Sequence, residues 1–266
     1  MSFKVYYFKP PPGVDLSEYW RKGDLREHFA LVEAETTLPV VISHMPVEDP
    51  ILDAGCGVGR WTYYLRKQGY RAIGLDRSYE GLEVARCHGY SFPGVCADVF
   101  ETPFQNEVFG AIISFGLVEH FEEGPLAALA ELRRILKPRG YLLIIVPYNN
   151  LFRKLVVNPL YRLRNVKRRL LGYELAFNEY RFSARELSRF LEKSGFEVHA
   201  CYPDEFVPPK CKGLFIDRRT LQGGLPETVS WEVGRGAKGL RKVLDAISPW
   251  LCSGGVLCVA QRAGSA

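Results

Sequence analysis

Three acidic residues stand at the ends of short apolar stretches, where their carboxylates could bind a ligand. Asp53 follows Ile51-Leu52, Asp76 ends the stretch 70–76, and Asp98 ends the stretch 94–98. Each stretch reads as a strand, and the carboxyl ends of parallel strands meet at one edge of a sheet. A carboxylate at the end of the second strand can accept hydrogen bonds from both hydroxyls of a ribose. The three acids therefore predict a binding edge for a ligand that carries a ribose.

A glycine turn comes directly after the first of these acids. Its glycines occupy alternate positions, Gly55, Gly57 and Gly59, and a helix-like stretch follows at 61–68. Without Cβ atoms, such a turn lets the backbone approach a ligand and aim free N–H groups at it. A dinucleotide fingerprint would need a glycine where Arg60 stands. The carboxylate of Asp53 beside the turn favours a cationic or zwitterionic ligand over a pyrophosphate.

These residues resemble the motifs of one enzyme family. The pattern Asp53-x-Gly55-x-Gly57-x-Gly59 resembles the first motif of the class I S-adenosylmethionine-dependent methyltransferases. The run 131–147, ELRRILKPRGYLLIIVP, resembles the helix, turn and strand that follow the cofactor site in that family. The resemblance covers residues 50–148 and 183–202 well and the final strand less specifically. It leaves 149–182 and 207–252 unexplained, as insertions.

The resemblance implies S-adenosylmethionine as the cofactor. In the family, an acid at the position of Asp98 usually meets the adenine amino group, and the next backbone N–H meets the edge of the ring. The cofactor is therefore expected to lie against Asp53, Gly55, Cys56, Gly57, Gly59, Asp76, Arg77, Asp98, Val99 and Phe115. Two simpler alternatives stay open, since Asp98 could cap a helix and Asp76 could be a surface charge.

The order of the stretches predicts an α/β fold. Apolar continuity at 141–146 is typical of a central parallel strand, and 109–115, 196–202 and 255–262 read as further strands. The resemblance implies a Rossmann-like, seven-stranded, mostly parallel sheet with helices on both faces and an antiparallel final strand. We expect one domain (1–266), made of an N-terminal cover (1–48), a cofactor-binding core (49–148), a basic lid insertion (149–182), a core continuation (183–206), a second insertion (207–252) and the final strand (253–266).

Glu119 and His120 follow the fourth strand, beside the topological switch point of the sheet. Methyl transfer from a sulfonium is an in-line displacement, and alignment of the reactants can supply ~7–11 kcal/mol. A base helps further when the acceptor is a hydroxyl or a protonated amine. An imidazole changes charge near neutral pH, so we expect both residues to be catalytic, with His120 as the base. Because the family often has a similar pair without using a base, the pair could instead shape the cofactor pocket.

The insertion from 151 to 172 is strongly basic and has no acid. Helical spacing from Leu160 onward places leucines on one side and basic residues on much of the other. Because the segment leaves the fifth strand above the cofactor, we expect a lid whose apolar side packs over an acceptor pocket. The aromatic residues expected to line that pocket are Tyr173, Phe177, Tyr180 and Phe182, with Phe206, Phe215, Trp231 and Trp250 closing its other side. The charges would also suit an anionic membrane or, ranked last, an RNA.

Composition limits the remaining choices. The chain has 266 residues, of which 47% are hydrophobic and 24% charged, so a globular domain with a sizeable core is expected. It has neither the long apolar run of a membrane span nor the layout of a signal peptide. Seven cysteines without a C-x-x-C pair predict reduced thiols in a cytoplasmic protein and no metal site.

The sequence thus predicts a methyltransferase acting on a small or lipid-like acceptor. Three alternatives stay open: a binding or regulatory protein that keeps the cofactor fold, an RNA-directed methyltransferase that uses the basic insertion, and a nicotinamide-dependent oxidoreductase. The complete set of acids and glycines speaks against the first. Arg60 in place of a glycine speaks against the last.

Overall fold

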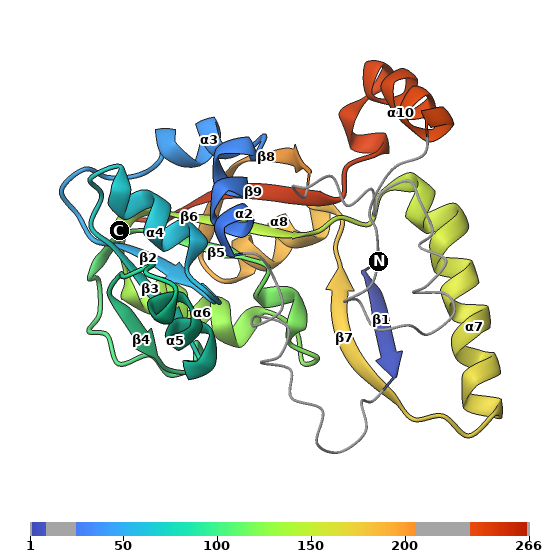
Figure 1. The fold of residues 1–266 in the computed structure, drawn as a ribbon, viewed down its shortest axis with the longest axis horizontal. Helices are drawn as coiled ribbons and strands as arrows, with labels where there is room; N and C mark the ends of the chain where they lie inside the picture. Colours follow the sequence, from blue (N-terminus) through green and yellow to red (C-terminus); the bar gives the residue numbers. More distant parts are fainter. Residues whose placement is uncertain (1, 9–24, 206–234, 265–266) are drawn as a thin grey trace.

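A computed structural model describes residues 2–8, 25–205 and 235–264. Its centre is a seven-stranded sheet in the order β4-β3-β2-β5-β6-β9-β8 (Figure 1). The strands are β2 (Ile51–Ala54), β3 (Ala72–Asp76), β4 (Gly94–Cys96), β5 (Phe109–Phe115), β6 (Leu136–Pro147), β8 (Phe196–Asp204) and β9 (Gly255–Arg262). Only β9 runs antiparallel to its neighbours within this sheet. The predicted Rossmann-like sheet with an inserted antiparallel final strand is confirmed.

Helices cover both faces of this sheet. Alternate residues of the central strand β6 point to opposite faces, since Leu142 and Leu143 belong to different core clusters. The face of Leu142 is covered by α6 (Leu126–Ile135) and α8 (Ala184–Lys193). The face of Leu143 is covered by α4 (Arg60–Lys67) and α3 (Leu38–Ser43). The helix α5 (Tyr79–Cys87) connects β3 to β4, and a capping box of Ser183 and Glu186 starts α8.

The N-terminal helices lie over the start of α4. They are α2 (Leu25–Ala30) and η1 (Leu31–Ala34), and Phe29 of α2 stacks on Tyr90 with ring centroids 3.8 Å apart. Leu25 and Phe29 pack with Val58 of the glycine turn. This contact agrees with the predicted N-terminal cover. Residues 1 and 9–24, which also belong to that cover, lie outside the described residues.

The strand β6 is longer than predicted. The resemblance of 131–147 implied a turn before a strand at 141–146, but α6 ends at Ile135 and the strand already begins at Leu136. Leu136 pairs with Phe109, and the register then shifts before Tyr141 pairs with Ala111. Arg139 takes a positive φ of 62° inside this irregularity. The stretch 137–140 is therefore an irregular part of the strand, because burial of Leu136 extends the sheet pairing back to it.

A second, two-stranded sheet pairs β1 (Phe3–Phe8) with β7 (Leu175–Arg181) in antiparallel orientation. On its outer side lies α7 (Asn158–Leu170), which continues from a π-helical turn, η3 (Arg153–Val157) (Figure 1). Phe3 and Val5 of β1 pack against Val157 and Tyr161 in a core cluster of their own. No sequence pattern predicted that 3–8 pairs with the insertion.

Two cysteines on adjacent strands form a disulfide. Cys201 of β8 and Cys258 of β9 are opposite each other in the register, and their Cα atoms lie 4.2 Å apart. The expectation that all seven thiols are reduced is therefore wrong for this pair, which only the pairing of β8 with β9 brings together.

The rest of the second insertion is described only in part. Phe206, Phe215 and Trp231, expected to close the acceptor pocket, lie outside the described residues. From 235 onward the insertion forms α10 (Arg235–Ile247) and η5 (Pro249–Leu251). None of the helices in the described part of the chain is long and apolar enough to cross a membrane.

Candidate functional site

The glycine turn joins β2 to α4 at the carboxyl edge of the large sheet. Its three glycines, Gly55, Gly57 and Gly59, all have positive φ, at 78°, 56° and 74°. Only glycine adopts this region without strain, so the turn depends on these residues. A Cβ on Gly59 would also lie 1.9 Å from the ring of Phe92. The ring of Phe92 therefore fixes the end of the turn from the outside.

Asp53 lies one residue before the end of β2 and is buried, with 4% of its surface exposed. Its Oδ2 accepts hydrogen bonds from the Thr62 hydroxyl at 2.7 Å and from the Thr62 backbone N–H at 3.1 Å. Burial raises the pKa of Asp53 to about 6, against the lowering effect of these two hydrogen bonds. The carboxyl group therefore ties β2 to the first turn of α4 and holds the glycine turn between them. No local sequence pattern predicts Thr62 as the partner of Asp53.

Asp76, at the end of β3, is joined directly to the glycine turn. Its Oδ2 accepts the Gly57 N–H at 2.8 Å, and its Oδ1 accepts the Ser78 N–H at 2.8 Å. A carboxylate has about four acceptor positions, so two backbone donors leave room for two ribose hydroxyls. Asp76 is only half-buried, which leaves it accessible to a ligand. The residue thus fits the ribose-binding role predicted for it.

The third acid lies after β4 and has a local partner. Asp98 is exposed, and its Oδ1 accepts the N–H of Phe100 at 3.0 Å, while Val99 is buried. This contact matches the simpler alternative of a local cap, and it leaves acceptor positions for an adenine amino group. Arg77 is exposed, and its carbonyl accepts the thiol of Cys96 at 3.5 Å.

Two further predicted contacts lie beside the turn. The thiol of Cys56 donates to the Gly57 carbonyl at 3.8 Å, and burial raises its pKa well above the ordinary value, so the thiol stays neutral. The ring of Phe115, at the end of β5, packs edge-on against Trp61 of α4 with centroids 5.1 Å apart. The ends of β2, β3, β4 and β5 thus carry all ten predicted cofactor contacts at one edge of the sheet.

Glu119 is the most unusual acid of this edge. It lies in η2 (Val118–His120), just after β5, with 3% of its surface exposed. Its Oε2 is buried and accepts no hydrogen bond within the described part of the chain. Burial raises the pKa of Glu119 to about 8. A buried polar atom without a partner is costly, so the site favours a neutral carboxyl group or a ligand that supplies a partner.

His120 lies beside this acid, with Nε2 at 4.0 Å from Glu119 Oε1. Its Nδ1 is 2.7 Å from the backbone carbonyl of Asn178 in β7. A carbonyl can only accept a hydrogen bond, so Nδ1 carries a proton. In the neutral imidazole, Nε2 is then the atom with the free lone pair. The hydrogen bond therefore selects the tautomer that a general base needs.

Aromatic side chains of β7 form a wall next to η2. The Phe177 and Tyr180 rings lie 5.0 Å apart, and Phe182 continues the row at 5.6 Å from Tyr180. The Tyr180 hydroxyl donates to the carbonyl of Glu122 at 2.8 Å, which fixes the wall to the segment after β5. Tyr173, expected in the same wall, is exposed at the far end of α7.

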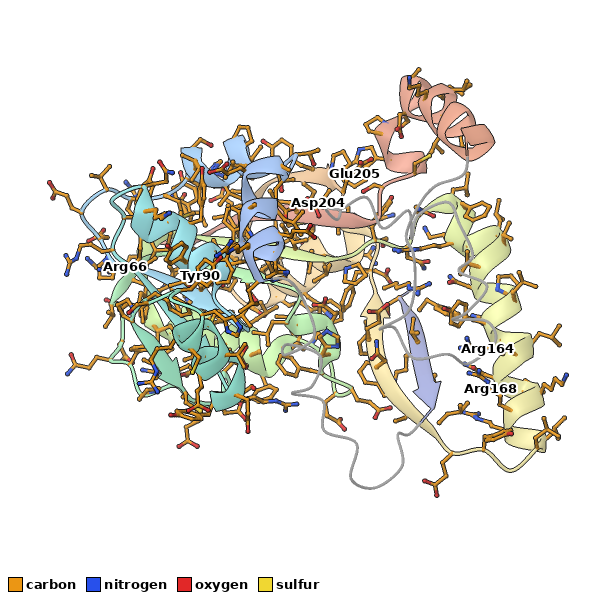
Figure 2. The ribbon with its side chains drawn as sticks, in the orientation of Figure 1. Arg66, Tyr90, Arg164, Arg168, Asp204 and Glu205 are labelled. Atoms are coloured by element: carbon orange, nitrogen blue, oxygen red, sulfur yellow. A yellow bond between two sulfur atoms is a disulfide. The ribbon has the colours of Figure 1, made fainter. Side chains whose placement is uncertain are left out.

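A second group of buried polar residues near the turn was not foreseen. Arg60, the first residue of α4, forms an ion pair with buried Glu35 at 2.7 Å. Thr37 donates to Asp204 at 2.9 Å, where β8 ends (Figure 2). Burial raises the pKa of Asp204 to about 6. These contacts fasten the segment after η1 across the same edge of the sheet, and they depend on the fold rather than on a local motif.

Comparisons with known proteins agree with this geometry. The family described as Methyltransferase domain matches residues 52–144. The tRNA (carboxymethyluridine(34)-5-O)-methyltransferase of Xenopus tropicalis is 32% identical over 136 residues, which are 48% of this chain and 21% of that protein. The ubiquinone biosynthesis O-methyltransferase of Histophilus somni is 32% identical over 104 residues, 36% of this chain and 43% of that protein. The chain thus spans less than half the length of either relative.

A solved structure extends the likeness to the fold. A methyltransferase from Methanosarcina mazei that depends on S-adenosylmethionine superposes with a TM-score of 0.58 at 17% identity, over 85% of this chain and 98% of that one. Within the described residues, no three His, Cys, Asp or Glu side chains gather as metal ligands would. Residues 52–144 thus match a methyltransferase domain, and the glycine motif and the fold agree with S-adenosylmethionine as its cofactor.

Proposed function

We propose that this protein transfers the methyl group of S-adenosylmethionine to a small or lipid-like acceptor bound beside η2. The observation that carries the proposal is the hydrogen bond from His120 Nδ1 to Asn178, which leaves Nε2 free to take a proton at the aromatic wall. When bound, the cofactor supplies a methyl group already activated by its sulfonium. The protein then has to hold the cofactor and the acceptor, align them and exclude water from the site.

In our proposal, the residues predicted to contact the cofactor bind different parts of it. Asp76 accepts the ribose hydroxyls while the Gly57 N–H keeps its carboxylate in place. Asp98 and the Val99 N–H meet the adenine. The glycine turn, held by Asp53 and Thr62, gives the ligand close access to backbone. The orphan Oε2 of Glu119 meets a polar or cationic group of either ligand.

His120 and Glu119 handle the proton in this proposal. Nε2 of His120 would accept the proton of a hydroxyl acceptor, or would first deprotonate an ammonium acceptor and so free the lone pair of its nitrogen. The resulting imidazolium would lie 4.0 Å from Glu119 Oε1, where its positive charge would favour the ionised form of that carboxyl group. Because 47% of the His120 side chain is exposed, the proton can pass on to solvent.

The aromatic wall beside η2 indicates which class of acceptor binds there. Phe177 and Tyr180 offer aromatic surface on β7, the strand that binds His120, while Phe182, just after β7, is buried. Such surface with few polar groups is typical of pockets for small apolar ligands. The same wall could stack unpaired bases, so an RNA acceptor is the second candidate, favoured by the tRNA-modifying relative.

Transfer of labelled methyl groups tests the proposal. The full chain is incubated with methyl-labelled S-adenosylmethionine and either a lipid and small-molecule extract or total RNA, with His120→Asn as the blank. We expect label in the lipid or small-molecule fraction. Label in RNA alone would refute the acceptor class, and no label in either fraction, with cofactor binding intact, would make the protein a binding or regulatory one.

A further inference from the structure

The helix α7 presents its apolar side to solvent. Leu163, Val166 and Leu170 are exposed to 70%, 56% and 83% of their surface. They fall on one side of the helix because residues three and four apart share a face. The expectation that this side packs over the acceptor pocket is therefore wrong, since it faces away from the rest of the described chain.

The inner side of α7 is occupied by arginines and a tyrosine instead. Tyr161 and Arg168 are buried, and the guanidinium of Arg164 lies 4.1 Å from the centroid of the Tyr161 ring. Arg164 and Arg168 project from the same helix in Figure 2. Stacking of guanidinium groups on aromatic rings is favourable, and it lets this basic side pack on the small sheet. The packing turns the leucines outward.

Cations flank the exposed apolar stripe on both sides. With 3.6 residues per turn, Arg162 and Arg169 lie along one border of the stripe and Lys167 along the other. All three are exposed. The guanidinium carbons of Arg162 and Arg169 also lie 5.6 Å and 5.9 Å from the centroids of the Phe3 and Tyr6 rings of β1, so these charged groups border the small sheet while both residues stay exposed. The outward side of α7 is therefore apolar at its centre and positive at its borders.

Neighbouring segments extend both properties. The turn before α7 exposes Leu155 to 68%, and Leu171 after it is exposed to 63%. The stretch 151–172 has no acidic residue and seven basic ones, Arg153, Lys154, Arg162, Arg164, Lys167, Arg168 and Arg169.

We propose that α7 is a docking helix that lies flat on an anionic lipid surface. Its exposed leucine and valine side chains enter the boundary between headgroups and acyl chains, while Arg162, Lys167 and Arg169 meet lipid phosphates. An apolar stripe bordered by cations is the pattern that binds in the plane of such an interface. This inference goes beyond the proposed methyl transfer and does not depend on it.

The same side of α7 fits RNA poorly. Phosphates need exposed cations, and bases need exposed aromatic faces. Here the Tyr161 ring is buried under Arg164, and the centre of the exposed side holds only aliphatic groups that an RNA cannot use. The apolar centre therefore decides between the two anionic partners in favour of lipid.

Vesicle sedimentation of the full chain, without methyl donor or acceptor, tests the proposal. We expect wild-type protein to bind vesicles of phosphatidylcholine mixed with phosphatidylglycerol, to bind pure phosphatidylcholine weakly, and to dissociate as salt is added. The triple variant Leu163→Ser, Val166→Ser, Leu170→Ser should bind at least about a hundredfold more weakly. The variant Arg162→Gln, Lys167→Gln, Arg169→Gln should lose roughly a hundredfold, about fivefold for each charge.

Matched variants elsewhere control for charge and hydrophobicity. Arg185→Gln, Arg189→Gln, Lys193→Gln removes three exposed cations from one side of α8, and Val47→Ser removes an exposed apolar side chain. Both should bind like wild type. The proposal is overturned if wild-type protein ignores the mixed vesicles, or if the leucine variant, with an unchanged melting temperature, still binds them. The helix would instead bind RNA if wild-type protein ignores vesicles but is retained on immobilised RNA, and if only the charge variant loses that retention.

Discussion

A hydrogen bond of 2.7 Å joins the imidazole Nδ1 of His120 to the carbonyl of Asn178, 58 residues later in the chain. It connects the segment after β5 to the strand β7 of the insertion. The insertion thereby sets the tautomer of a residue at the cofactor edge, and it brings the aromatic wall beside that residue. The first prediction follows from this contact.

Replacing His120 with Asn should lower turnover by about a hundredfold and leave the affinity for S-adenosylmethionine unchanged, because the variant loses the proton acceptor alone. Steady-state kinetics measure the turnover, and calorimetric titration measures the affinity. His88→Asn is the matched control, since His88 is also exposed and its Nδ1 bonds a backbone carbonyl at 2.8 Å. If affinity and melting temperature fall together in the His120 variant, the residue only shapes the pocket.

Glu119 should make the protein less stable as pH rises. Its pKa is about 8 in the folded chain against an ordinary 4.5, so the folded state binds the extra proton between these values. The stabilising contribution is complete below the ordinary value and is lost as pH rises toward 8. Urea unfolding should show wild type losing up to about 3 kcal/mol more than Glu119→Gln between pH 6 and pH 8.

Other buried acids do not disturb this comparison. Burial also raises the pKa of Asp53 and of Asp204 to about 6, but both groups are present in wild type and variant. The exposed Glu123→Gln serves as the control and should follow wild type. Parallel curves for wild type and Glu119→Gln over this range would contradict the account of Glu119.

Replacing Gly59 with Ala should destabilise the fold by two separate effects. A positive φ of 74° costs an alanine roughly 1–2 kcal/mol, and its Cβ would meet the Phe92 ring. Gly69→Ala separates them, because Gly69 also has a positive φ but has no atom within 4 Å of the added Cβ. Urea midpoints should fall in both variants and further for Gly59→Ala. Equal losses would show that Phe92 does not fix the turn.

The order of the large sheet could be predicted from the sequence because each of its signals is local. Apolar runs mark the strands, the glycines mark the turn after Asp53, and the Ser183 capping box marks the start of α8. The prediction that the three acids lie at one edge of the sheet needed only the rule that parallel strands end at the same edge. The long strand β6 was underestimated because the Pro138-Arg139-Gly140 turn signals hid a register shift within the pairing.

The missed features all depend on contacts between distant parts of the chain. The Cys201–Cys258 disulfide needs the register of two strands, and the Asp204–Thr37 hydrogen bond needs the N-terminal segment to cross the sheet. The orientation of α7 was predicted the wrong way round because its leucines form a clear amphipathic pattern. Periodicity locates an apolar side, but the arginine–tyrosine packing on the small sheet decides which way that side faces.

Calorimetric titration of S-adenosylmethionine into wild type, Asp76→Ala and Asp49→Ala tests the central claim most directly. Asp49 just precedes β2, at the opposite edge of the sheet from Asp76, and pairs with Lys137 at 2.6 Å. Wild type and Asp49→Ala should bind equally, and Asp76→Ala at least about tenfold more weakly, because it loses hydrogen bonds to a charged acceptor. Wild-type affinity in Asp76→Ala, or binding of a nicotinamide dinucleotide in place of S-adenosylmethionine, would contradict the account.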